Sequence, residues 1–408
     1  MSKFIKNKIN SEIITIIDLW SYKIRVAICE FLKNNSNKES IKLLAFTEKR
    51  QSIWDIETNT IKNLDNICEN IQIAIKKAEK IANIKTNKVA INSSFMPSFL
   101  ETSKINYKRT NKNKLINIDE LKNILKDIET KSIKNQTKRI KEKYDYSFKN
   151  LDIILNDISN INIDNELTSK LIWFSWEKIS FNITNIFIPK SNFDTINYIE
   201  KYLKIKITKI LPEEFTLTRL WKKQKDIVII NIWNSSSYIT IKDKNWNIIW
   251  SIKIDVWIEK LINNIKQISN LTRSEIIKKL NRDDFYKQEK KDFLDIYSFL
   301  ILQSLKEILK EKICPNNFFI IWWWWNNNFF KNYLKKINFI DYWIKITKQI
   351  KFILPDIKKI AKIENVEEIL NKSNLNIISM ILTYDFLLQK KENTIEKITK
   401  NIIEKLED

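Results

Sequence analysis

The chain has 408 residues, with 71 Lys and Arg against 49 Asp and Glu, and it contains 14 tryptophans but no glycine and no histidine. The net charge of +22 favours an anionic partner, nucleic acid or a membrane surface, although A/T-rich codons for Ile, Lys, Asn and Phe produce much of the same bias. The lack of histidine excludes His-based triads and His metal sites, and Cys29, Cys68 and Cys314 are too widely spaced for a zinc site or a disulfide framework.

Two stretches share one pattern and predict two hairpins. "ITIIDLWSYKIRVAI" covers residues 14–28, and "IVIINIWNSSSYITI" covers residues 227–241. Each has an apolar run, then Asp or Asn, an aliphatic residue, Trp, a short polar tract and a second run of alternating polarity, which is typical of strand, tight turn and strand. We interpret them as a duplicated hairpin that opens two halves of one molecule, with chance similarity between Ile-rich strands as the alternative.

Helices and strands follow the first hairpin. Apolar spacing predicts a helix over residues 63–84, and "KVAINSS" predicts a strand. From about Ser94 to Trp173 the chain is polar and carries a helix over residues 117–133 that Asn117 or Asp119 begins, so we interpret this region as an inserted subdomain. "EKISFNITNIFIP" then predicts a strand and "NFDTINYIEKYL" a helix.

The second hairpin is followed by a similar alternation. The pattern predicts mostly helix over residues 256–313, a buried strand in "NNFFIIWWWW" and a helix in "NNNFFKNYLKKI". The whole layout predicts an α/β fold. No signal peptide and no apolar run of about 18 residues is present, so we expect a cytoplasmic protein.

Four consecutive tryptophans, residues 322–325, are unexpected at the end of a strand, because successive side chains point in different directions. At ordinary usage the chain would hold roughly 29 glycines, the residues that reach positive φ at little cost. Some bacterial lineages decode UGA as glycine, whereas a common translation table decodes it as tryptophan. We therefore hypothesise that the tryptophans are glycines in the native protein. If they are literal, a basic chain with clustered indoles favours single-stranded nucleic-acid binding.

With that reading, the chain resembles the actin-like ATPase family over nearly its whole length, and within it the FtsA-like bacterial cell-division proteins. The family's D-x-G-T-S-K is similar to "DLWSYK" from Asp18, its D-x-G-G-G-T to "NIWNSS" from Asn231, and its G-G-G adenosine loop to "IIWWWW". "WFSWEK" resembles the FtsA stretch G-L-S-G-x-R. The tryptophans that take the family's glycine positions are Trp20, Trp173, Trp176, Trp233, Trp257, Trp323 and Trp324, whereas Trp221 and Trp343 are uninformative.

The resemblance implies a duplicated, actin-like (ribonuclease H-like) α/β fold with an inserted subdomain in the first half. The implied boundaries are 12–90 for the first half, 91–175 for an FtsA-type insertion, 176–222 for the return to the first half, 223–356 for the second half, 357–389 for closing helices of the first half and 390–408 for an amphipathic tail.

The resemblance also implies that ATP and Mg²⁺ bind in the cleft between the halves. Asp18 would hold Mg²⁺, usually through water, and Asp18 and Asn231 would occupy the catalytic positions. The implied nucleotide-binding residues are Trp20, Ser21, Lys23, Trp233, Asn234, Ser235, Ser236, Glu275, Lys278, Trp323, Trp324 and Trp325. Glu275 and Lys278 equally fit a solvated helix face. Asn231 stands where the family has Asp, so we expect at most a weak ATPase, and the acidic residue expected between the halves is Glu213 or Glu214.

The implied partners are the tubulin-like division protein FtsZ, further copies of the chain in filaments, and the inner face of the cell membrane, with no nucleic acid. "TIEKITKNIIEKLED" places an apolar stripe on one face of a tail helix. It lacks aromatic residues and its charge is nearly balanced, so packing on protein is the alternative to membrane anchoring. A PilM-like adaptor of type IV pilus assembly, which shares the inserted subdomain, is the alternative function.

Overall fold

The computed structural model describes residues 10–20, 22–33, 40–52, 55–57, 60–93, 95–164, 166–167, 175–221, 226–232, 237–244, 248–254, 258–280, 285–310, 312–322, 327–356, 363–369 and 374–390. The chain divides into two compact units. Unit 1 comprises Met1–Leu220 and Asp356–Asp408, and unit 2 comprises Trp221–Pro355. The second half expected from the sequence, 223–356, has similar bounds.

Unit 1 contains a mixed six-stranded sheet in the order β11-β6-β1-β2-β3-β17. Its strands are β1 (Asn10–Leu19), β2 (Lys23–Lys33), β3 (Ser40–Arg50), β6 (Lys88–Asn92), β11 (Lys206–Leu211) and β17 (Ile363–Glu364). The first predicted hairpin is confirmed, because β1 and β2 pair antiparallel from Asn10↔Lys33 to Leu19↔Ile24. β6 runs parallel to β1 and β11 parallel to β6, so the carboxyl ends of these three strands meet at one edge.

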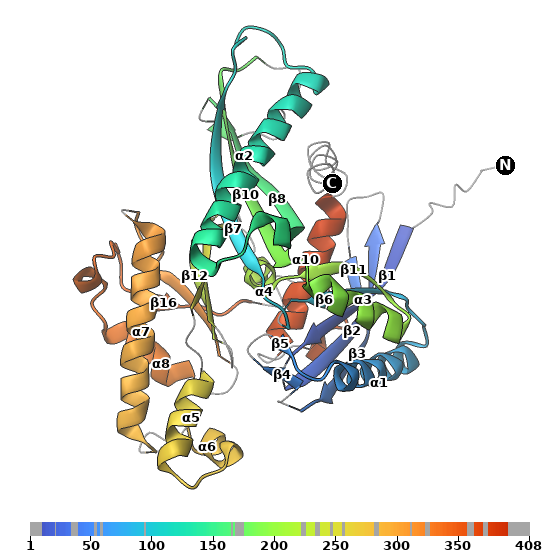
Figure 1. Ribbon diagram of the computed structural model, residues 1–408, viewed down its shortest axis with the longest axis vertical. Helices are drawn as coiled ribbons and strands as arrows, with labels where there is room; N and C mark the ends of the chain where they lie inside the picture. Colours follow the sequence, from blue (N-terminus) through green and yellow to red (C-terminus); the bar gives the residue numbers. More distant parts are fainter. Residues whose placement is uncertain are drawn as a thin grey trace, which may run out of the picture. The chain divides into compact units, whose positions relative to one another are not determined.

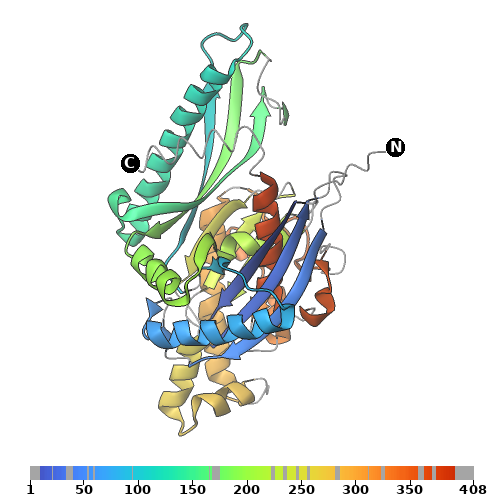
Figure 2. The same ribbon diagram turned by 90° about the vertical axis from the view of Figure 1, so that its right-hand side faces the viewer.

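Two helices cover opposite faces of this sheet (Figures 1 and 2). The predicted helix is α1 (Leu64–Ala82); the Asn63 side chain accepts a hydrogen bond from the Asn66 N–H, and the helix ends at Asn83 with φ 54°. Its apolar stripe packs on buried residues of β1, β2 and β6. The other face carries α10 (Leu375–Lys390), where Tyr384 lies 5.1 Å from the ring of Phe31.

The inserted region forms its own sheet with one long helix against it (Figure 2). The strand order is β7-β10-β8-β9, with β7 (Phe99–Lys108), β8 (Leu151–Ile163), β9 (Glu166–Leu167) and β10 (Lys178–Pro189). Asn117 caps α2 (Ile118–Tyr144), which extends well beyond the expected end at residue 133. β10 pairs with both β7 and β8, so a strand expected in the return to the first half belongs to the sheet of the insertion. The chain then returns through α3 (Asn192–Leu203) to β11.

Unit 1 also contains shorter elements among its described residues. They are β4 (Ile56–Glu57), β5 (Thr60–Ile61), η2 (Phe148–Asn150), α4 (Glu213–Thr216), η3 (Leu217–Leu220) and η5 (Val366–Ile369). All three cysteines of the chain are buried and free. Across the described parts of both units, no helix is long and apolar enough to cross a membrane.

Unit 2 contains a five-stranded sheet in the order β14-β13-β12-β15-β16. Its elements are β12 (Ile227–Ile232), β13 (Ser237–Lys242), β14 (Ile248–Ile254), α5 (Ile258–Ile268), α6 (Arg273–Lys279), α7 (Lys287–Leu309), β15 (Asn317–Trp322), α8 (Asn327–Lys336), η4 (Phe339–Tyr342) and β16 (Lys351–Phe352). β12 and β13 form the second predicted hairpin, and β15 pairs parallel to β12. The duplicated hairpin and the α/β class predicted from the sequence are therefore confirmed.

Candidate functional site

Asp18 lies near the carboxyl end of β1, in the interior of unit 1. Across the hairpin its register partner is Arg25 of β2. The parallel neighbour β6 ends at Asn92, which brings that amide to the same edge of the sheet. Asp18 and Asn92 are fully buried and Arg25 is 3% exposed. Strand register alone therefore collects a carboxylate, a guanidinium and an amide at this edge.

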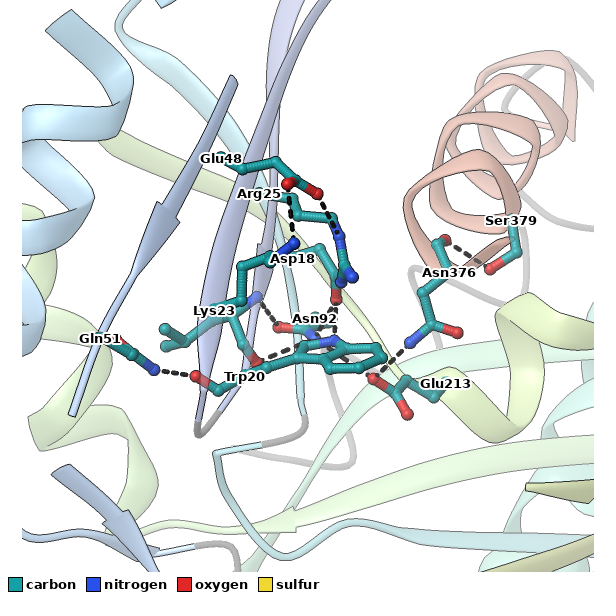
Figure 3. A network of polar contacts seen from close by, with 11 residues as sticks. Asp18, Trp20, Lys23, Arg25, Glu48, Gln51, Asn92, Glu213, Asn376 and Ser379 are labelled. Carbon is teal, nitrogen blue, oxygen red and sulfur yellow. Dashed lines mark hydrogen bonds and ion pairs between the residues drawn. The ribbon is translucent and has the colours of Figure 1, made fainter. Parts of the chain in front are cut away.

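Both oxygens of the Asp18 carboxylate accept hydrogen bonds from the protein (Figure 3). Oδ1 accepts from Trp20 Nε1 at 2.6 Å and from Asn92 Nδ2 at 2.8 Å, and Oδ2 accepts from Arg25 Nη1 at 3.1 Å. Burial raises the pKa of Asp18 to about 6, although the Arg25 charge and the hydrogen bonds from Trp20 and Arg25 act to lower it. Asp18 is thus a buried acidic residue that forms an ion pair with Arg25 of the same hairpin.

Lys23, an implied phosphate-binding residue, pairs with Glu48 of β3 in this structure. Its Nζ lies 2.7 Å from Glu48 Oε2, and Arg25 Nε lies 3.2 Å from Glu48 Oε1. Lys23 remains partly exposed, with 21% of its side chain accessible. Two cations and two carboxylates therefore alternate around the turn, and Lys23 is the cation of the four that solvent reaches.

The structure separates the roles of the two adjacent glutamates, which the sequence left open. Glu213 Oε1 accepts from Asn92 Nδ2 at 3.3 Å and from Asn376 Nδ2 of α10 at 2.9 Å. Glu214 Oε1 instead accepts from Ser98 Oγ at 2.9 Å, at the start of the insertion. Asn92 thus connects Glu213 to Asp18, so Glu213 is the glutamate that joins the Asp18 network (Figure 3).

In unit 2, Asn231 lies at the carboxyl end of the central strand β12. It pairs with Tyr238 of β13 and with Ile321 of β15, and it is 1% exposed. The first residue of β13, Ser237, accepts a hydrogen bond from Tyr297 of α7 at 2.8 Å. Asn231 therefore occupies in unit 2 the strand-end position that Asp18 occupies in unit 1.

Most of the implied loop residues lie outside the described residues. These are Ser21, Trp233, Asn234, Ser235, Ser236, Trp323, Trp324 and Trp325, together with Trp173 and Trp257. Their nucleotide contacts stay predictions.

The implied adenine-binding helix is α6, and there Glu275 has a different contact. Its carboxylate accepts from the backbone N–H of Thr272 at 2.8 Å and from Thr272 Oγ1 at 2.7 Å, which forms a capping box. These hydrogen bonds lower the pKa of Glu275. Glu275 and Lys278 are both exposed. Their described environment is that of a helix start and a solvated face, and a role in nucleotide binding stays a prediction.

Several tryptophans occupy positions that suit an indole poorly. Trp343 has φ 62° and ψ 25°, the left-handed region where glycine is favoured, and its side chain is 78% exposed. Trp176 and Trp221 are buried, and within the described residues their indole N–H groups have no hydrogen-bond partner, which is unusual for Trp. Trp20 has no positive φ, but its Nε1 donates to Asp18 and the Arg25 guanidinium lies 4.5 Å from its ring centroid.

Sequence reasoning missed Arg25, Asn92 and Asn376. Arg25 stands two residues after Lys23 in a strand of alternating polarity, so its side chain faces the same way as that of Lys23. That spacing, together with the position of Asp18 directly across the tight hairpin, could have indicated that Arg25 belongs to the site. Asn92 and Asn376 are ordinary polar residues in apolar segments, and only the packing of β6 and α10 brings them to the site.

The fold and the strand-end positions of Asp18 and Asn231 define the class: the chain has the actin-like ATPase fold. A solved structure that it resembles is that of the PilM–PilN type IV pilus biogenesis complex, with 9% sequence identity, coverage of 92% of this chain and 98% of that chain, and a TM-score of 0.54. The ethanolamine utilization protein EutJ from Carboxydothermus hydrogenoformans matches at 7% identity over 93% of each chain, with a TM-score of 0.43. No protein-family model and no curated protein matches the sequence.

The resemblance of the sequence implies a nucleotide and Mg²⁺. The described surroundings of Asp18 do not fit a metal ligand, because Mg²⁺ needs carboxylate oxygens that face water and it keeps most of its hydration shell. Here the carboxylate is fully buried, and a guanidinium, an amide and an indole donate to it.

Proposed function

We propose that this chain is a nucleotide-binding adaptor of the FtsA type, which binds ATP and links the FtsZ-like division protein to the inner face of the cell membrane. The observation that carries the proposal is the buried Asp18–Asn92–Glu213 network at the strand ends beside the first hairpin. It agrees with the cell-division resemblance of the sequence, in which a strand-end Asp and an acidic residue between the halves serve the nucleotide site.

The proposal includes glycine at the tryptophan positions of the native protein. Trp343 at φ 62° and the buried indoles of Trp176 and Trp221 support it independently of the loop motifs. The coding DNA tests it directly: UGA codons support glycine, and UGG codons contradict it. Peptide masses of the protein from its native cells give a second, independent reading of the same positions.

ATP binding is tested by calorimetric titration of two forms, the tryptophan chain and the chain with glycine at all 14 positions. We expect only the glycine form to bind, because an indole at position 20 covers Asp18. In the glycine form, Lys23→Ala should weaken binding, because Lys23 is the accessible cation at the turn. Lys88→Ala is the matched control, since Lys88 pairs with Glu12 at the opposite edge of the same sheet. Equal affinity of the two forms would contradict the glycine hypothesis.

A second candidate is a PilM-like adaptor of type IV pilus assembly, favoured by the match that covers 98% of the chain in the PilM–PilN structure. The purified chain is mixed with the FtsZ-like protein of the same genome and, separately, with its PilN-like protein. Binding to the first supports the division role, and binding to the second alone replaces it with the pilus role.

A nucleic-acid-binding role for literal tryptophans has little support in the described part of the chain. Trp20, Trp176 and Trp221 are buried there and present no face for stacking on bases, and the exposed Trp343 contacts Lys306. We therefore propose that the chain has no nucleic-acid partner, and a filter-binding assay with single-stranded DNA tests this.

A further inference from the structure

The Asp18 carboxylate is neutralised by a cation of the chain itself. Arg25 Nη1 lies 3.1 Å from Asp18 Oδ2, and both side chains are almost completely buried. A guanidinium stays protonated in proteins, so this positive charge is permanent. Asp18 Oδ1 accepts from Asn92 in addition, which leaves neither oxygen without a donor from the protein.

Arg25 is fixed in this position by three constraints. It stands directly across the hairpin from Asp18 in the β1–β2 register. Its Nε lies 3.2 Å from Glu48 Oε1, so a second carboxylate holds the opposite side of the guanidinium. Glu48 is in turn held by Lys23 at 2.7 Å. These contacts therefore hold the guanidinium beside Asp18.

A divalent cation at Asp18 would have to displace these donors and lie next to a buried positive charge. Like charges repel strongly where water does not screen them. Mg²⁺ also demands near-ideal octahedral geometry and retains several waters, whereas Asp18 is fully buried. Arg25 donates to Asp18 from β2 and Asn92 donates from the end of β6, so we expect these two hydrogen bonds to remain when residue 20 is glycine.

We infer that Arg25 takes the place of the divalent metal ion at the first hairpin, so that Asp18 binds no metal and nucleotide binding does not require Mg²⁺ there. The part that concerns nucleotide rests on the proposed function. The part that concerns metal does not, since it follows from the Asp18 contacts alone. In this site Asp18 acts as a positioning residue, which holds a guanidinium at the turn where the phosphates are expected.

Metal binding at Asp18 is tested with Mn²⁺ as a probe, by measuring the relaxation of water protons. The parent is the full chain, in its tryptophan form and in its glycine form. We expect the parent and Asp18→Asn to bind Mn²⁺ equally weakly. Arg25→Gln should gain a Mn²⁺ site, and adding Asp18→Asn to it should abolish that site. Arg25→Lys, which keeps the charge, should gain none. Circular dichroism confirms that each variant is folded.

Two results of the Mn²⁺ experiment would overturn the inference. One is Mn²⁺ binding by the parent that Asp18→Asn removes, a comparison that needs no Arg25 variant. The other is a folded Arg25→Gln that binds no more Mn²⁺ than the parent. A second experiment compares the dissociation constant of ATP in Mg²⁺ and in EDTA. We expect a change of less than about threefold for the parent, and a tenfold loss in EDTA would contradict the inference. If ATP binds in neither condition, the proposed function fails, while the Mn²⁺ result still decides the role of Arg25.

Discussion

Replacing Trp343 by glycine should leave the stability of the protein about unchanged, whereas replacing it by alanine should lower it. Trp343 follows η4 at φ 62°, and its N–H donates to Ile340 O at 2.9 Å, so the left-handed turn is held by a backbone hydrogen bond. An L-residue other than glycine pays about 1–2 kcal/mol in this conformation. Both substitutions remove the same indole, which makes alanine the matched control for glycine.

The expected magnitudes follow from the exposure of the side chain. Because the indole is 78% exposed, its removal sacrifices little burial. It also sacrifices a contact with Lys306, whose Nζ lies 5.8 Å from the ring centroid, worth about 0.5–1 kcal/mol at an exposed site. Glycine recovers the backbone strain but loses about 0.4–1 kcal/mol through the greater freedom of the unfolded chain. The glycine variant should thus be more stable than the alanine variant by about 0.5–1 kcal/mol.

The assay is urea unfolding of the full chain, with the midpoints of parent, Trp343→Gly, Trp343→Asn and Trp343→Ala compared. We expect the order Gly, Asn, Ala, since Asn tolerates the left-handed region better than Ala. An alanine variant as stable as the glycine variant would show that residue 343 carries no strain, and Trp343 would no longer support glycine in the native protein.

Three further predictions concern hydrolysis, the insertion and the tail. In the glycine form, Asn231→Asp should raise phosphate release from ATP, and robust turnover without this change would assign the work to another residue. Arg109→Leu should lower the free energy of unfolding by about 1–3 kcal/mol, because Arg109 is buried and donates to the Glu120 carboxylate of α2 at 2.8 and 2.9 Å. The control is Lys122→Leu, which breaks an exposed ion pair on the same helix and should change the free energy of unfolding by less than about 0.5 kcal/mol. If the tail, which lies outside the described residues, anchors the protein, vesicle co-sedimentation should vary little with salt and should be lost in Ile398→Glu with Ile402→Glu; a double variant that still sediments would place the membrane contact elsewhere.

The hairpins, α1 and β15 could be predicted from the sequence because each depends on local pattern. Alternating apolar residues fix the strands, and the Asn63 cap with its apolar stripe fixes the start of α1. The second half of α2 was not predicted because polar residues interrupt its stripe. Gln136 is buried there, and its amide donates to the carbonyls of Glu101 at 3.3 Å and Ile183 at 3.1 Å. A polar residue that hydrogen-bonds a facing sheet cannot be told from a loop residue by hydropathy.

The candidate site shows a similar division between local and long-range information. Asp18 and Asn231 were predicted because each ends a strand in a recognisable hairpin, and the structure places both at strand ends. The contacts of Asp18 were not predicted, because they depend on which atoms meet across strands. The choice between Glu213 and Glu214 is the clearest example. These adjacent residues of α4 accept hydrogen bonds from different partners, Asn92 and Ser98.

The entry and exit of the insertion lie side by side, because Phe99 at the start of β7 pairs with Phe187 near the end of β10. We therefore expect that the insertion can be lengthened, shortened or exchanged without changing the register of β6 and β11 on either side. Ser98, next to that junction, bonds the neighbour of Glu213. The same junction is the natural place to graft a foreign domain onto the chain.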